Sequence, residues 1–189
     1  MDTSNAHDPW KRASTTLIPE RGSRVEKVRH FRPIQEILIH PPKHDSVSFS
    51  EPPEAVFQAA LGVLQNAKNA TLLAAHNGGG RLIAREKPKM SNAKFVNIQV
   101  DGEAAGSQLH VVIGTDPRNP KALLDGKANA KSLKNFVENV RGALDGSKPA
   151  PASPVTDHFL QKKTEMPWSD PTQDPEIELD GNIRAAYGL

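Results

Sequence analysis

The pattern of hydrophobic positions predicts two amphipathic helices, one near each end of the central part of the chain. In residues 51–66, apolar side chains recur every three or four residues, the spacing that gathers them on one face of a helix. They are Val56, Phe57, Ala60, Leu61 and Leu64. The same spacing recurs in residues 130–144, at Leu133, Phe136, Val137, Val140 and Leu144. Each helix therefore has one apolar face that must pack against another part of the fold.

Between the two helices, four short segments have the composition and alternation of β-strands. Residues 71–76 and 81–86 flank the sequence Asn77-Gly78-Gly79-Gly80, whose residues tolerate the positive φ angles of a tight hairpin. Residues 94–101 and 107–114 flank a second, looser turn that contains two glycines. In this second pair of strands every other residue is apolar, so one face of the sheet is apolar. The residues on that face are Val96, Ile98, Val100, Leu109, Val111 and Ile113.

These elements predict a two-layer α+β sandwich. A four-stranded antiparallel sheet carries the two helices on one face, in the order helix, hairpin, hairpin, helix, and extended N- and C-terminal segments complete the chain. We expect residues 1–44 to form a mildly basic, partly ordered N-terminal arm, and residues 45–146 to form the α+β domain. Residues 147–189 read as a proline-rich linker followed by an acidic C-terminal tail. Whether residues 24–40 join the domain is left open.

Composition limits the chain to one modest core. Only 37% of its 189 residues are hydrophobic and 5% are aromatic, and 16 are prolines. It contains no run of about 18 apolar residues, so we expect no membrane span. Its N-terminal residues lack the apolar region of a secretory signal, so we expect a cytoplasmic location. The net charge is only +2, with a mildly basic arm and a mildly acidic tail. This charge difference is far smaller than that of the polybasic blocks that bind nucleic acids, and it favours two solvated extensions.

No motif in the chain specifies a reaction. His40 and His44 have a spacing that would suit a metal on a helix, but Pro41 and Pro42 lie between them and prevent that helix. The sequence has no serine in the context of an exposed nucleophile, no carboxylate pair at a meaningful spacing and no cysteine. We therefore expect a protein that is not an enzyme and that binds no metal and no cofactor.

Two groups of residues are candidates for binding. The first consists of isolated aromatic side chains in the arm and tail: Trp10, Phe159, Trp168 and Tyr187. Such anchors, in segments that cannot fold alone, become ordered by lying on another surface. The second group lies on the sheet face opposite the helices: Arg81, Arg85, Phe95, Asn97 and His110. An aromatic ring beside arginines can stack unpaired bases, although this face can also be ordinary exposed sheet or be covered by the chain's own arm.

The arms and their anchors favour one function over two alternatives. We expect a non-enzymatic protein-binding or assembly subunit, in which a small rigid domain is tethered to a larger protein complex by its terminal segments. The alternative is a module for RNA or single-stranded nucleic acid that uses the open face of the sheet. A second alternative is a small-ligand or lipid-binding module with a pocket between the sheet and the helices. The identity of a partner and the oligomeric state stay open.

Overall fold

The computed structural model describes residues 42–89, 91–116, 119 and 125–178. In chain order, this part of the protein contains one strand, one helix, four strands, a second helix and two short strands. The strands are β1 (Lys43–Phe49), β2 (Ala70–His76), β3 (Arg81–Glu86), β4 (Lys94–Glu103), β5 (Gly106–Thr115), β6 (His158–Gln161) and β7 (Thr164–Pro167). The helices are α1 (Pro53–Asn66) and α2 (Asp125–Leu144).

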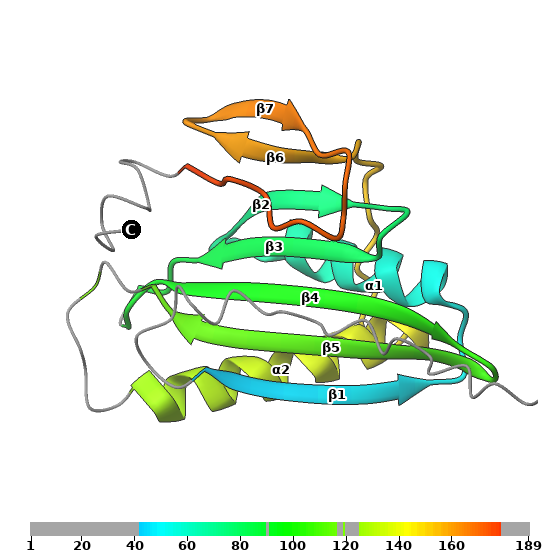
Figure 1. Ribbon diagram of the computed structural model, residues 1–189. Helices are drawn as coiled ribbons and strands as arrows, with labels where there is room; N and C mark the ends of the chain where they lie inside the picture. The colour runs from blue at the N-terminus through cyan, green and yellow to red at the C-terminus, as the bar shows by residue number, and fades with distance from the viewer. Residues whose placement is uncertain (1–41, 90, 117–118, 120–124, 179–189) are drawn as a thin grey trace, which may run out of the picture. The chain divides into compact units, whose positions relative to one another are not determined.

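The strands form a single sheet in the order β1-β5-β4-β3-β2-β6-β7, and each neighbouring pair is antiparallel (Figure 1). At one edge, β1 pairs with β5 along its whole length, from Lys43 opposite Ile113 to Phe49 opposite Ser107. Near the other edge, β6 pairs with β2 only through residues 158 and 159. The last hairpin is therefore attached to the sheet by a much shorter ladder than the first strand.

The predicted α+β class is confirmed, with an antiparallel sheet and two helices, but the predicted four-stranded sheet is wrong. In the described residues the sheet has seven strands. The sequence pattern does not reveal the additional strands, because β1 offers only Val47 and Phe49 as apolar positions and because β6 and β7 are four residues each. Both of the latter fall in the segment predicted as linker and tail. The order helix, hairpin, hairpin, helix describes only the middle of the chain.

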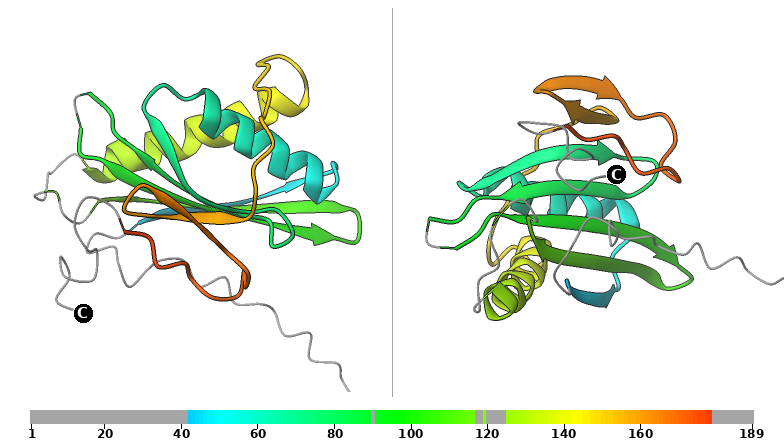
Figure 2. Two further views of the ribbon diagram at one scale, coloured as in Figure 1. Left: turned by 90° about the horizontal axis from the view of Figure 1, so that it is seen from above. Right: turned by 60° about the vertical axis from the view of Figure 1, so that its left-hand side comes forward.

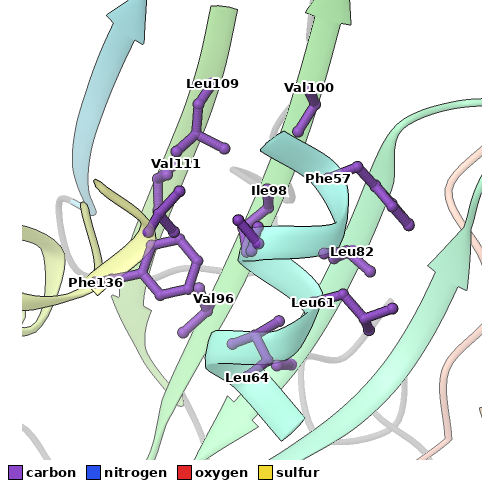
Figure 3. Close-up of a cluster of buried hydrophobic side chains, with 14 of the residues drawn as sticks. Phe57, Leu61, Leu64, Leu82, Val96, Ile98, Val100, Leu109, Val111 and Phe136 are labelled. Carbon is purple, nitrogen blue, oxygen red and sulfur yellow. The ribbon is translucent and has the colours of Figure 1, made fainter. Parts of the chain in front are cut away.

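The main core fills the space between the two helices and one face of the sheet. Both helices lie on the same side of the sheet (Figure 2). Leu61 of α1, Val96 of β4 and Val111 of β5 have no exposed surface, and Phe136 of α2 is 4% exposed (Figure 3). Burial of each such side chain contributes about 1.5–3 kcal/mol relative to exposure in water. The apolar faces predicted for both helices are the faces that the structure buries.

A second, smaller core lies on the opposite face of the sheet. Here Ile83 of β3 and Phe95 of β4 pack against Trp168 and Ile177, which follow β7. A register shift in β2 between residues 72 and 74 marks an irregularity of the bulge type; Leu73 and Ala74 both lie in this second core, while Leu72 and Ala75 belong to the main core. The chain's own C-terminal segment therefore covers part of the second face of the sheet (Figure 1).

Candidate functional site

The two arginines predicted to bind on the second face of the sheet both form ion pairs within the chain. One Nη of Arg81 lies 2.7 Å from Oδ1 of Asp174, and the other donates to the carbonyl oxygen of Pro171 at 2.8 Å. Its guanidinium also lies 5.0 Å from the centre of the Trp168 ring. Arg85 is paired at 3.0 Å with Asp116, whose carboxylate is fully buried. Both positive charges are thus neutralised by carboxylates of the same chain.

The other predicted residues of this face are also in contact with their own chain. Phe95 is 7% exposed and belongs to the second core, so its ring is not available for a base to stack on. Nδ1 of His110 lies 2.8 Å from Oγ of Ser46. Asn97 is 3% exposed, and neither atom of its amide has a hydrogen-bond partner. A role for Asn97 and His110 in binding a partner stays a prediction.

The predicted aromatic anchors of the tail lie on the chain's own sheet. Trp168 is 4% exposed; its Nε1 donates to the carbonyl oxygen of Asp170 at 2.8 Å, and its ring meets that of His76 edge to face at 5.4 Å. Phe159 pairs with Ala74 in the sheet and packs against the second core. Trp10 and Tyr187, the remaining predicted anchors, lie outside the described residues.

The middle of the fold leaves little room for the pocket that the second alternative placed between sheet and helices, because the main core fills that space. A cavity of about 410 Å³ opens instead at one edge, where the C-terminal half of α1 meets the middle of α2. We call it the interhelical groove. Its lining residues are Val63, Leu64, Asn66, Ala67 and Asn69 from α1 and the turn after it, Glu86 from β3, Ser132, Asn135, Phe136 and Asn139 from α2, and Lys148, Pro149 and Ala150.

One wall of the interhelical groove is built by the segment after α2, residues 148–153, which we call the strap. Gln65 exchanges two hydrogen bonds with the backbone of Ser153, at 2.7 and 3.0 Å, and Nδ2 of Asn66 donates to the carbonyl oxygen of Pro151 at 3.0 Å. The strap approaches α1 so closely at Gly62 that a Cβ there would collide with the carbonyl oxygen of Ala150. Glycine at this helical position therefore permits the contact that holds the wall in place.

We call the part of the groove lined by Glu86 and Ser132 its polar end; a buried lysine lies behind it and does not line the groove. Lys94 is 5% exposed and points toward α2, where its Nζ donates to Oγ of Ser132 at 2.7 Å and to the carbonyl oxygen of Ala128 at 3.1 Å. Burial lowers the pKa of Lys94, against the opposing effect of the negative charges of Glu86 and Asp125. Glu86 is the residue directly opposite Lys94 in the β3–β4 ladder. Glu86 and Ser132 both line the groove, so the lysine is hydrogen-bonded to one of these groove residues and lies opposite the other in the sheet.

None of these three polar residues was among the predicted site residues. Two of them nevertheless leave a signal in the sequence. Lys94 has the same strand parity as Val96, and Glu86 has the same parity as Ala84, so both charges fall on the apolar face of the sheet. A charge at an apolar position needs a partner or a function. Ser132 leaves no comparable signal, since it is one of many polar residues on α2.

Other kinds of site find no support within the described ranges. They contain no group of three or more His, Cys, Asp or Glu side chains placed to hold a metal ion. His44 lies in β1, and His40 falls outside the described residues. Neither α1 nor α2 is sufficiently long and apolar to cross a membrane.

Comparisons with known proteins give only distant likenesses. No protein-family model and no curated protein matches the sequence. Among solved structures, Ara h 8.0201 has 9% identity and a TM-score of 0.44, over 56% of this chain and 98% of that one. Protein MLL2253 from Mesorhizobium loti has 13% identity and a TM-score of 0.43, over 57% and 98%. The AHSA1-like protein RHE_CH02687 from Rhizobium etli has 12% identity and a TM-score of 0.43, over 65% and 94%. With TM-scores below 0.5, these likenesses assign neither a family nor a function to the chain.

Proposed function

We propose that this protein is a small-ligand-binding module and that the interhelical groove is its site. The observation that carries the proposal is the groove itself, a concavity of about 410 Å³ with apolar residues at its base and polar side chains along its walls. Pockets for small molecules are commonly of this size, and they combine apolar lining with a small number of polar groups that fix orientation. The apolar base is formed by Val63, Leu64 and Phe136.

The surroundings of the groove favour a stable binding site over an accidental gap. The strap that forms one wall is held to α1 by the side chains of Gln65 and Asn66. Leu64 and Phe136, at the base, are 3% and 4% exposed and belong to the main core. A ligand would therefore meet a surface that is already ordered, which reduces the entropy lost on binding.

The two other readings of the sequence lose their structural basis in the described residues. The assembly reading relied on four aromatic anchors; Phe159 and Trp168 pack against the chain's own sheet, and the other two, Trp10 and Tyr187, lie outside the described residues. The nucleic-acid reading relied on an exposed ring with two free arginines, but Phe95 is buried and both arginines are paired with carboxylates. This leaves the ligand-binding alternative as the function that the geometry supports best.

We propose binding and not catalysis for the same groove. Ser132 and Lys94 lie within hydrogen-bond reach of each other, the arrangement that activates a serine nucleophile in some hydrolases. Such a reaction also needs donors aimed at the developing oxyanion, usually backbone N–H groups. Ser132 lies well inside α2, where the pattern of the helix uses the backbone N–H groups around it. The pair is therefore better suited to holding a ligand than to attacking one.

A groove-filling substitution tests the proposal. Asn135 lies on the exposed side of α2 and lines the groove, so Asn135→Trp should occupy the cavity without disturbing the core. The full chain, labelled with ¹⁵N, would be screened against a library of small fragments by chemical-shift mapping. We expect fragments that shift the groove residues and that bind at least tenfold more weakly to Asn135→Trp.

The matched control is Lys131→Trp, one turn earlier on α2, exposed and outside the groove. This variant should bind the same fragments as the wild type. A screen in which no fragment perturbs the groove residues, or in which both tryptophan variants bind equally well, would refute the proposed function.

A further inference from the structure

From the polar end of the groove we infer the class of ligand that it accepts, an inference that rests on the proposed function. The ligand has an apolar body and a neutral polar head in which a carbonyl oxygen stands beside an N–H or O–H group, as in a primary carboxamide. Ser132 donates to the carbonyl oxygen, and Glu86 accepts from the neighbouring N–H or O–H. Lys94 does not touch the ligand; it positions and polarises Ser132.

The donor side follows from the contact between Lys94 and Ser132. A lysine ammonium has three donors and no acceptor, so the 2.7 Å contact uses an N–H of Lys94 and a lone pair of Ser132 Oγ. The hydroxyl proton of Ser132 has no acceptor within the described residues. Because the side chain lines the groove, that proton is free to turn into it. A hydroxyl that accepts from a cation is also a stronger donor than a free hydroxyl.

The acceptor side is provided by Glu86. Its carboxylate lines the groove, and no N–H or O–H group of the described residues donates to it. Glu86 and Lys94 are directly opposite in the β3–β4 ladder and project from the same face of the sheet. Lys94 reaches Ser132, so the donor and the acceptor of the groove flank one lysine side chain. The ligand head must therefore present its acceptor and its donor within the length of that side chain.

The charges of the site select a neutral head. Glu86 is negative. Lys94 is positive when protonated, but its ammonium group is hydrogen-bonded to Ser132 and does not line the groove. An anionic head would lie against the carboxylate of Glu86 and lose solvation. The cation in the groove lining, Lys148, is exposed and donates to Oδ1 of Asn139 at 3.3 Å, so its ion pair with such a head would be weak. A cationic head would pair with Glu86 but would leave the donor of Ser132 without an acceptor. Only a head that has both an acceptor and a donor forms hydrogen bonds with both Ser132 and Glu86.

Four benzene derivatives of similar size separate these possibilities. Benzamide has a carbonyl oxygen beside N–H donors, benzoate has acceptors and a negative charge, benzylamine has donors and a positive charge, and anisole has a single weak acceptor. Each would be titrated into the ¹⁵N-labelled full chain and its affinity obtained from shifts of the groove residues. We expect benzamide to bind at least fivefold more tightly than each of the other three.

Variants then assign the preference to the two side chains. Ser132→Ala should weaken benzamide about five- to tenfold and leave anisole unchanged, because it removes one hydrogen bond to a neutral acceptor. Ser132→Cys, which keeps the volume and offers only a weak donor, repeats the test if loss of the hydroxyl beside Lys94 unfolds the alanine variant. Glu86→Gln should weaken benzamide about threefold, since a neutral acceptor forms the weaker bond. Glu138→Gln, an exposed residue of α2 outside the groove, is the control.

The outcomes distinguish an incorrect ligand class from an incorrect binding site. If all four probes shift the groove residues with similar affinity, or if Ser132→Ala and Ser132→Cys both bind benzamide like the wild type, the groove is a binding site but the inferred head is wrong. If none of the probes shifts the groove residues and the fragment library also fails to do so, the proposed function itself is overturned, and the ligand class with it.

Discussion

Replacing Trp168 by alanine should release the C-terminal segment from the second face of the sheet. The indole is 4% exposed, lies against the guanidinium of Arg81 and donates from Nε1 to the backbone at Asp170. Removing a buried Trp or Phe side chain typically costs about 3–5 kcal/mol, and a cation–π contact adds about 0.5–2 kcal/mol. The short β2–β6 ladder has only two residue pairs to resist this loss. We therefore expect docking of residues 158–178 to weaken by about 3 kcal/mol or more.

The assay is amide hydrogen exchange, read by mass spectrometry, together with urea denaturation. Because the main core does not include Trp168, exchange should accelerate in β6, β7 and the residues up to 178, while α1 keeps its protection. Trp168→Phe keeps a ring but loses the Nε1 donor, and should cost about 1–2 kcal/mol. The control is Met166→Ala, at a side chain 36% exposed, which should stay within about 0.5 kcal/mol of the wild type. Unchanged protection of residues 158–178 in Trp168→Ala would refute the assigned role of the indole.

Two further predictions concern pH. Burial lowers the pKa of Lys94, so keeping this lysine charged costs stability in the folded state. As the pH rises through the lowered pKa toward the unfolded value of 10.5, the folded lysine loses its proton first, and the wild type should gain stability relative to Lys94→Met. Urea denaturation of both proteins between about pH 7 and pH 10.5 measures this difference, and a difference independent of pH would contradict it. Burial acts to raise the pKa of Asp157, but hydrogen bonds from the backbone and side chain of Asn77 and the nearby His76 outweigh it and lower that pKa. The stability from Asp157 should therefore be lost as pH falls below about 4, and Asp157→Asn, compared with the wild type by thermal unfolding, should lack this part of the acid sensitivity.

The elements that could be predicted from the sequence are those whose side chains carry the pattern. Strands β2 to β5 and both helices each carry an apolar face that packs in the main core, so alternation and three- and four-residue steps reveal them. Strand β1 is an edge strand whose residues are mostly exposed, and it is held by backbone hydrogen bonds that any sequence can form. Strand β7 is likewise an exposed edge strand, and β6 and β7 are only four residues long each. Periodicity cannot find such strands, because pairing with a neighbour creates them.

The tail shows a different limit of sequence reasoning. The sequence indicates that Trp168 needs a surface to lie on, since a large aromatic residue in polar text cannot be buried locally. It also indicates that Phe95 and Ile83 are apolar residues on the second face of the sheet. It does not indicate that Trp168 packs against these two residues. Residues 147–157, which connect α2 to β6, have no periodic pattern that would show where the tail lies. From the sequence alone, a surface of another protein and a surface of the same chain are equally suitable for burying Trp168.

The groove could not be predicted for a related reason, yet its polar end breaks the pattern of the core. Its walls come from four parts of the chain, and the strap reaches α1 only because residue 62 is glycine. At this end of the sheet, however, the inner face carries Lys94 and Glu86 where β3 and β4 elsewhere carry apolar residues. Removing a charged group from water costs free energy unless the group is paired and hydrogen-bonded. The fold therefore gains little stability from Lys94 and Glu86. Their consequence is at the groove, where Glu86 provides an acceptor and Lys94 holds the donor Ser132.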